Sequence, residues 1–157
     1  MTTLPSSTLL IYFKDYEQSH QTKGNKIIHF FGIPLVIFST LGLLAYLTLW
    51  TPSPDSLLKI DLGLLLAGFA AFFSLRVDYK MGIPFALFIY LNYLLARHCS
   101  LTALIIMNVI GWIFQFGGHI IYEKKSPAFL TSLQHIFIGP MWIFAWTIGY
   151  YRPTASK

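Results

Sequence analysis

Charged residues are scarce in this chain of 157 residues. Only 11% of them are Asp, Glu, Lys or Arg, whereas 55% are hydrophobic. An average soluble domain carries about 25% charged residues. With so little charge the chain cannot cover the surface of a water-soluble domain, which excludes an ordinary cytosolic globule and a disordered protein. The 11 basic residues are scattered between apolar runs rather than gathered in a stripe, which excludes a nucleic-acid partner.

Cysteine and several common catalytic motifs are missing as well. The single cysteine, Cys99, excludes a disulfide framework and a cysteine-based zinc or iron–sulfur site. We expect Cys99 to be a small buried apolar residue. The sequence contains no glycine-rich phosphate-binding loop, no Gly-x-Ser-x-Gly and no His-Glu-x-x-His. These absences disfavour a nucleotide-binding protein, a serine hydrolase and a zincin.

Long apolar runs dominate what is present. A helix needs about 20 apolar residues to cross a hydrocarbon core of about 30 Å. Two runs reach that length, and three shorter ones suit upright or re-entrant segments; the five runs are 27–50, 57–75, 81–96, 101–122 and 136–151. The first run is too long for the core of a signal peptide. We therefore predict an all-α fold: an integral membrane helical bundle of about five transmembrane or membrane-embedded helices.

The first 26 residues follow a different pattern. A serine at position 6 or 7 can cap a helix that runs to about Ser19. Apolar and charged residues alternate along this helix, which suits a helix lying on the membrane surface. We predict a single membrane domain over 1–157, divided into an interfacial or cytosolic segment (1–26), the helical bundle (27–151) and a tail (152–157).

Alternating directions for five spans predict which loops share a face. Residues 1–26, 76–82 and 122–135 then lie on one face, and the C-terminus lies on the other. The first face holds seven of the Lys and Arg residues and the second holds four. The positive-inside rule accordingly places the first face in the cytosol.

The histidines are distributed unevenly between these two faces. Four lie at or just inside the first face, and His98 lies at the second; the four are His20, His29, His119 and His135. His29 and His119 fall inside apolar runs at similar shallow depth, where ionisable residues are costly and usually face the bundle interior or a site. Taken singly, each histidine is more typical of an interfacial or hydrogen-bonded residue. Together, several imidazoles at one end of a bundle could bind iron, zinc or copper.

Polar residues next to His119 could complete such a site. Gln115 and Glu123 stand four residues before and after His119, and so share its helical face. Glu123 could orient a ligand histidine as a hydrogen-bond acceptor, or bind the metal directly. We take Gln115 and Glu123 as candidate catalytic residues. Gly117 and Gly118 would allow another backbone or a ligand to approach closely.

Three stretches of the sequence together resemble a known family. The first is 16–34, which ends in N-K-I-I-H-F-F-G-I-P. The second is 112–130, which reads W-x-x-Q-F-x-G-H-x-x-Y-E-K-K-x-P-A-F-L. The third is 132–140, with a histidine and a closing Gly-Pro. They resemble the small membrane family of fungal 2-hydroxy fatty acid dioxygenases and their bacterial relatives, over roughly residues 8–150.

This resemblance implies iron(II)-dependent alpha-oxidation. A 2-hydroxy fatty acid reacts with dioxygen, loses its carboxyl carbon and becomes a fatty acid one carbon shorter. The implied ligands of Fe(II) are histidines, which in this sequence are His20, His29, His119 and His135. Four lysines lie near these histidines in the sequence: Lys23, Lys26, Lys124 and Lys125. By default they anchor the protein at lipid headgroups. We also take them as candidate substrate-binding residues, which would steer the carboxylate of the acid. The implied location is the bacterial inner membrane or the fungal endoplasmic reticulum, with the histidine face cytosolic.

Two alternatives remain open from the sequence. The same scaffold could hold another metal-dependent lipid hydroxylase or a lipid hydrolase. It could also be a small membrane scaffold or a transporter subunit without enzymatic activity. Oxygen uptake and product mass separate the first alternative from a dioxygenase, and bound metal separates the second.

Overall fold

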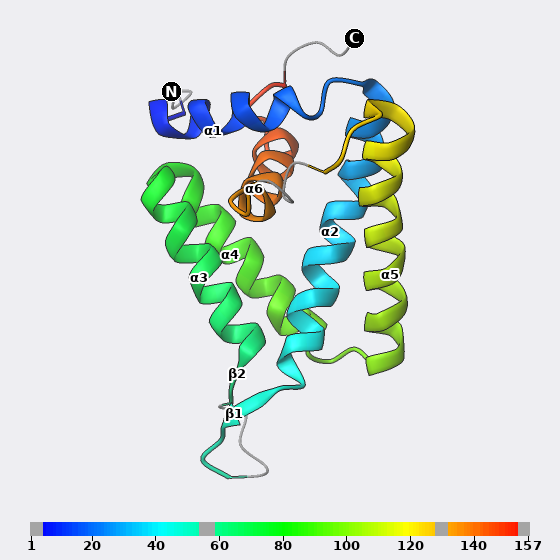
Figure 1. Ribbon diagram of the computed structural model, residues 1–157. Helices are drawn as coiled ribbons and strands as arrows, with labels where there is room; N and C mark the ends of the chain where they lie inside the picture. The colour runs from blue at the N-terminus through cyan, green and yellow to red at the C-terminus, as the bar shows by residue number, and fades with distance from the viewer. Residues whose placement is uncertain (1–4, 54–58, 128–131, 154–157) are drawn as a thin grey trace.

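The computed structural model describes residues 5–53, 59–127 and 132–153, and it is helical apart from one short antiparallel hairpin (Figure 1). The elements in chain order are α1 (Ser7–Gln18), α2 (Lys23–Ala45), β1 (Thr48–Trp50), β2 (Ile60–Asp61), α3 (Leu62–Val77), α4 (Tyr79–Ala96), α5 (Leu101–Gly117), the π-helix η1 (Gly118–Glu123) and α6 (His135–Thr147). The all-α prediction is confirmed, and an apolar helix occupies each of the five predicted runs.

The five apolar helices differ in length. Three of the described helices are long and apolar enough to cross a membrane: α2, α4, and α5 continued by η1. Helix α3 is shorter, with 16 residues. Helix α6 has 13 residues, which at 1.5 Å per residue give about 20 Å, short of the hydrocarbon thickness. Figure 1 shows α6 almost end-on, whereas α2, α3, α4 and α5 run down the picture. The helix in the run 136–151 is therefore too short to cross the hydrocarbon core by itself.

The C-terminal residues return to the end of the bundle that holds α1. The Tyr151 ring packs edge-on against Phe13, with 4.9 Å between ring centroids. The Tyr150 hydroxyl donates to Asp78 Oδ2 over 3.2 Å, and the same oxygen accepts the backbone N–H of Ser6 over 2.7 Å. The prediction that the C-terminus lies on the opposite face was wrong because α6 lies across the bundle. We call this end, formed by α1, the α3–α4 junction and η1, the polar end.

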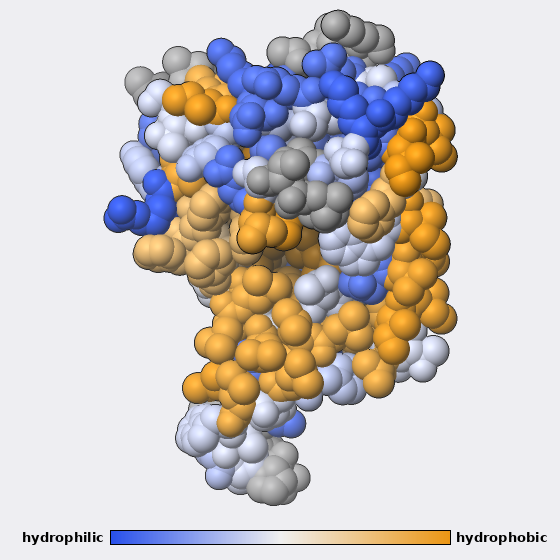
Figure 2. All heavy atoms as spheres, in the orientation of Figure 1, coloured by the Kyte–Doolittle hydropathy of each residue, from blue (hydrophilic) through white to orange (hydrophobic). Residues whose placement is uncertain are grey.

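Basic residues gather at the polar end. Eight described Lys and Arg side chains belong to it: Lys14, Lys23, Lys26, Arg76, Lys80, Lys124, Lys125 and Arg152. Two more, Lys59 and Arg97, belong to the opposite end. Figure 2 shows hydrophilic side chains concentrated at the top of the molecule and a broad hydrophobic band below them. This asymmetry is steeper than the one expected from five alternating spans, because Arg152 lies at the polar end and Lys157 lies outside the described residues.

Helix α1 lies across the polar end, as Figure 1 shows. It begins after Ser6, whose hydroxyl accepts the backbone N–H of Leu9 over 3.1 Å, so the predicted serine cap is confirmed. Its buried face includes Phe13 and Tyr16. Trp142 on α6 donates its indole N–H to Glu17 over 3.1 Å, which ties α1 to the interior of the bundle.

Glycines bring α2 and α5 into backbone contact. A Cβ on Gly32 would lie 3.2 Å from the carbonyl oxygen of Gly111, and a Cβ on Gly111 would lie equally close to the carbonyl oxygen of Gly32. Small residues allow transmembrane helices to approach in this way. The contact extends to Gly118, where a Cβ would lie only 2.4 Å from Asn25 Oδ1. Of the two glycines singled out in the sequence, only Gly118 makes a close approach, because the nearest atom to a Cβ on Gly117 is 4.0 Å away.

Candidate metal centre

Three histidines from distant parts of the chain meet inside the polar end. His20 lies in the link between α1 and α2, His29 lies on α2, and His119 lies in η1. Each offers one ring nitrogen, and these nitrogens all lie within 4.8 Å of one another. All three side chains are buried, with at most 3% of their surface exposed. We call them the three-histidine group.

The spacing of His29 and His119 fits a shared metal ion. Their Nε2 atoms are 3.2 Å apart and their rings are nearly perpendicular, at 87°. Two imidazole nitrogens that bind one ion at about 2.1 Å lie about 3.0–3.4 Å apart. These two nitrogens are within hydrogen-bond distance of each other. With the ring protons on Nδ1 instead, both Nε2 lone pairs could bind one ion.

His20 is held in the tautomer that a metal ligand needs. Its Nδ1–H donates to the carbonyl oxygen of Tyr16 over 2.7 Å, so Nε2 keeps its lone pair. Its ring stacks on the Tyr16 ring, with 3.8 Å between centroids. Burial, together with the nearby His119, lowers the pKa of His20 to about 3 against the opposing effect of the bond to Tyr16. The imidazole is therefore neutral at physiological pH, which is the form that binds metals.

Glu123 fastens η1 to the beginning of α2. Its Oε1 accepts three hydrogen bonds: from the Thr22 backbone N–H (2.8 Å), the Thr22 hydroxyl (2.9 Å) and the Asn25 amide (3.1 Å). Asn25 and His29 are four residues apart on α2, just as Glu123 and His119 are in η1. Helix α2 and η1 are thus joined by two pairs of side chains: His29 with His119, and Asn25 with Glu123. Glu123 holds His119 in place through this clamp, and none of these three bonds goes to a histidine.

The local geometry around His119 is unusual. The backbone from Gly118 to Glu123 forms a π-helix, a rare conformation that recurs at functional sites. It ends at Lys124, which has a left-handed backbone with φ 52°. The π-helix turns His119 toward α2, where the absence of a side chain on Gly118 leaves room for the contact.

Gln115 lines the cavity and carries an unpaired amide group. It lies on α5 about one turn before His119, and 7% of its surface is exposed. Its Nε2 has no hydrogen-bond partner among the described residues. An unpaired buried donor costs about 1–3 kcal/mol. A carboxylate or hydroxyl oxygen of a bound ligand would remove that cost.

His135 lies near the three-histidine group but is not a member of it. Its Nε2 is 2.9 Å from Asp15 Oδ2, and its ring contacts the edge of Tyr16, with 5.9 Å between centroids. Tyr16 thus contacts both His20 and His135. A role for His135 as a fourth ligand stays a prediction.

The four candidate lysines lie outside the cavity that adjoins the histidines. Lys26 is buried, with 5% of its surface exposed, whereas Lys23, Lys124 and Lys125 are exposed. None of the four is among the described residues that line the cavity. Their role in steering a carboxylate stays a prediction.

Sequence reasoning missed Tyr16 as a site residue. Tyr16 is buried, lines the cavity and supports His20 through both its ring and its carbonyl oxygen. Burial raises the pKa of its hydroxyl above the ordinary value, so the group remains protonated and can donate a hydrogen bond. The available signal was spacing, because Tyr16 precedes His20 by four residues in a helical segment.

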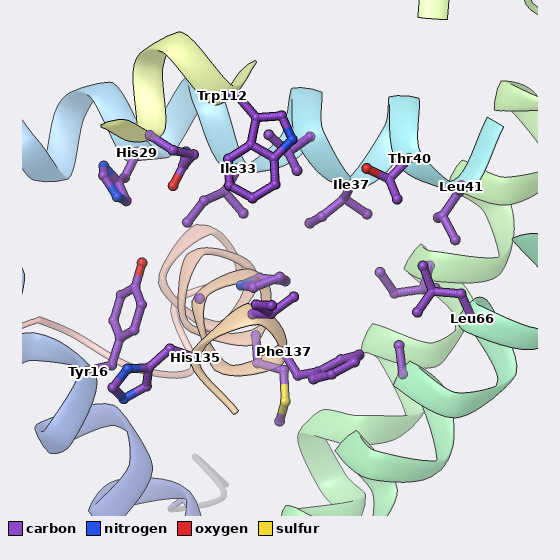
Figure 3. Close-up of a pocket in the computed structure, with 18 of the residues that line it drawn as sticks. Tyr16, His29, Ile33, Ile37, Thr40, Leu41, Leu66, Trp112, His135 and Phe137 are labelled. Carbon is purple, nitrogen blue, oxygen red and sulfur yellow. The ribbon is translucent and has the colours of Figure 1, made fainter. Parts of the chain in front are cut away.

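The cavity beside the histidines has a volume of about 200 Å³. One end is lined by polar side chains, among them Tyr16, Gln115 and the three-histidine group. The other end is lined by apolar side chains that include Leu41 and Leu66. Figure 3 shows His29 and Tyr16 at one side of the cavity and Leu41 and Leu66 at the other. Such a cavity matches a long molecule with one polar end.

Fold and site together define a class: a helical membrane protein with buried histidines at the polar end of an elongated apolar cavity. A family model described as 2-hydroxy-palmitic acid dioxygenase Mpo1-like matches residues 7–151. The chain belongs to this Mpo1-like family, which confirms the resemblance found in the sequence.

Among known proteins, the chain is similar to the 2-hydroxy-palmitic acid dioxygenase MPO1 of Saccharomyces cerevisiae. The two are 28% identical over 142 residues, which cover 86% of this chain and 78% of the yeast protein. No solved structure matches the chain.

Proposed function

We propose that this protein is an Fe(II)-dependent dioxygenase that converts a 2-hydroxy fatty acid into the fatty acid one carbon shorter. The observation that carries the proposal is the placement of three buried histidines at the polar end of an elongated apolar cavity. The name of the yeast relative supports the substrate class.

The donor set suits iron. Neutral imidazoles are common ligands of iron, and three of them leave positions open for substrate. His20, His29 and His119 would hold the ion, and the Tyr16 carbonyl and the Glu123 clamp keep two of the rings in place. When bound, Fe(II) supplies the one-electron chemistry through which dioxygen can react with a closed-shell acid.

The protein's own side chains would bind and orient the acid. The Gln115 amide, which is unpaired and belongs to a residue that lines the cavity, would donate a hydrogen bond to the carboxylate or hydroxyl oxygen, and the apolar walls would exclude water from the reacting carbons. The overall reaction consumes one dioxygen and yields the shorter acid, carbon dioxide and water. The CH(OH)–COOH unit provides all the electrons that this reduction of dioxygen requires, so no separate reductant is needed.

The proposal is tested with purified protein in lipid nanodiscs. Iron content is measured, and 2-hydroxypalmitic acid is then supplied under oxygen while oxygen uptake and product mass are followed. We expect oxygen uptake with formation of pentadecanoic acid. The His29→Ala variant should lose this activity, whereas His98→Ala should keep it, because His98 is exposed at the opposite end.

Other results would identify the alternatives. A product that gains oxygen and keeps all its carbons would indicate a hydroxylase. Cleavage of a lipid ester without oxygen uptake would indicate a hydrolase. Purified protein that binds no metal would favour a scaffold or a transporter subunit.

The orientation in the membrane follows from charge. We propose that the polar end faces the cytosol, because the described chain has eight basic residues there and two at the opposite end. An acid released by cytosolic or leaflet enzymes would then meet the histidines at the boundary between lipid and water.

A further inference from the structure

The cavity follows one face of α2 away from the histidines. His29, Ile33, Ile37 and Leu41 all line it, and their spacing of four residues places them on one side of the helix. Twelve residues separate His29 from Leu41, which corresponds to about 18 Å along the helix axis. Two acyl layers fill a hydrocarbon core of about 30 Å, so one membrane acyl chain spans about 15 Å. The cavity is therefore long enough for one acyl chain.

The far half of the cavity has the chemistry of a hydrocarbon site. Its walls include Leu41, Leu66, Phe85 and Ile89, and no charged Lys, Arg, Asp or Glu is among the described residues that line the cavity. The hydroxyl of Thr40 accepts a hydrogen bond from the Asn108 amide over 3.0 Å, so it already has a partner. This part of the cavity presents methyl and methylene groups to its occupant.

The far end of the cavity is buried. Leu41 is 2% exposed and Ile89 is 3% exposed, so the end of the cavity lies within the bundle. Leu66 faces Leu41 across this end, as Figure 3 shows. The neighbouring Leu65 is 51% exposed on the outside of α3. Leu65 and Leu66, which are adjacent on α3, thus face the outside of the bundle and the cavity, respectively.

An opening lies on the apolar side of the molecule. Figure 2 shows a hollow in the broad hydrophobic band below the hydrophilic end, with hydrophobic side chains to its left and below it and less hydrophobic ones to its right. It lies between α3 on one side and α2 and α5 on the other, and these helices provide cavity walls. An acyl chain could pass through this opening from the bilayer without crossing water.

We propose that the cavity is the binding channel for the acyl tail of the substrate, entered sideways from the lipid, and that Leu41 and Leu66 set the longest tail it accepts. The head group of the acid then lies at the three-histidine group and the tail runs along α2. The identity of the head group rests on the proposed function, but binding of the tail does not require oxidation.

The test measures binding of saturated fatty acids that lack the 2-hydroxyl group. Protein in nanodiscs is loaded with fluorescent parinaric acid, which is displaced by acids of increasing length from lauric to stearic. Leu66→Trp fills the far end, and Leu65→Trp adds the same side chain to the outside of the same helix. A misplaced methylene in an apolar pocket changes affinity by about tenfold or more. We expect Leu66→Trp to weaken stearic and palmitic acid by at least about tenfold with lauric acid little changed, and Leu65→Trp to match the parent.

A second variant keeps the test decisive if Leu66→Trp does not fold. Leu66→Ala lengthens the channel, so its preference should shift toward longer acids. Equal weakening of all lengths, or no change in length preference for either variant, would overturn the proposal. A length shift without any oxidation of 2-hydroxypalmitic acid would leave the channel standing and reject the proposed function instead.

Discussion

The Nε2 atoms of His29 and His119 lie 3.2 Å apart although 90 positions separate the two residues in the sequence. Backbone contact between α2 and α5 produces this proximity, since Gly32 and Gly111 approach each other closely and Gly118 leaves room beside Asn25. The same pairing aligns Glu123 with the beginning of α2.

Removal of any member of the three-histidine group should abolish metal binding. We expect the alanine variants of His20, His29 and His119 to lose at least about nine-tenths of the bound iron, because each removes one of three imidazole ligands. Iron per protein molecule, measured by mass spectrometry after reconstitution, gives the answer, and His98→Ala is the control. Unchanged metal content in all three variants would disprove a shared site.

His135 should affect turnover more than metal content. Its Nε2 is engaged by Asp15, so we expect His135→Ala to keep most of the iron while lowering turnover by roughly 10²-fold, the lower range for a polar group that handles a proton. Asp15→Asn should lower turnover less than His135→Ala does, because the asparagine side chain retains an acceptor oxygen for the imidazole. Loss of iron in His135→Ala would instead make His135 the fourth ligand.

Gly118→Ala should damage the site, whereas Gly117→Ala should not. A Cβ at Gly118 would lie 2.4 Å from Asn25 Oδ1 and 2.9 Å from His29 Nδ1, so α2 and η1 would have to separate. Overpacking of this kind costs about 1–3 kcal/mol, and we expect lower thermal stability together with loss of iron. A Cβ at Gly117 meets its nearest atom at 4.0 Å. Equal behaviour of the two variants would contradict the close contact.

Asp78 should stabilise the polar end in a pH-dependent way. Burial alone would raise the pKa of Asp78, but hydrogen bonds from the Ser6 and Met81 backbone amides, the Tyr150 hydroxyl and the Lys80 amide outweigh burial and lower it below 3.8. Its stabilising effect is therefore complete above the unfolded value and is lost as pH falls through the lower folded value. We expect Asp78→Asn to reduce the unfolding free energy by about 1–3 kcal/mol at neutral pH.

The measurement is thermal unfolding of the two proteins between neutral pH and pH 3. The gap in melting temperature between the parent and Asp78→Asn should narrow as the pH falls below the ordinary pKa of an aspartate, because the unfolded parent chain takes up a proton there before the folded protein does. A gap that is constant with pH would show that the charge of Asp78 is not responsible.

The single cysteine can report orientation. Cys99 is half-buried rather than fully buried as expected, and it lies in the α4–α5 link, at the end opposite the histidines. With the polar end in the cytosol, a membrane-impermeant maleimide should label Cys99 in intact cells. Lys14→Cys in a Cys99→Ser background places the thiol at the polar end and should be labelled only after permeabilisation. The reverse pattern would invert the proposed orientation.

Much of the helix pattern was predictable because it is local. Runs of apolar residues indicate membrane helices whatever their neighbours are, and the serine cap of α1 depends on three adjacent residues. The second run shows the limit, since its helix begins at Leu62 rather than near residue 57. The Asp61 carboxylate caps this helix through the Leu64 backbone N–H (2.8 Å) and accepts the Tyr93 hydroxyl (2.8 Å).

Contacts between distant parts of the chain were harder to predict from the sequence. The orientation of α6 depends on contacts such as Trp142 with Glu17, which link residues 125 positions apart. The same contacts decide that His135 meets Asp15. The approach of His29 and His119 was anticipated from their common depth, and that of His20 from its place at the same face and from the family resemblance. The part played by Tyr16 required knowing how α1 lies across the bundle.

The π-helix that carries His119 also sets the order of events during biosynthesis. His20 and His29 leave the ribosome early, but His119 follows α5, the last of the long apolar helices. A nascent chain inserted up to α4 would expose two imidazoles without a complete pocket. If the three-histidine group binds iron as proposed, the metal is expected to bind only after insertion of nearly the whole protein, so that only finished molecules would gain the capacity to handle oxygen.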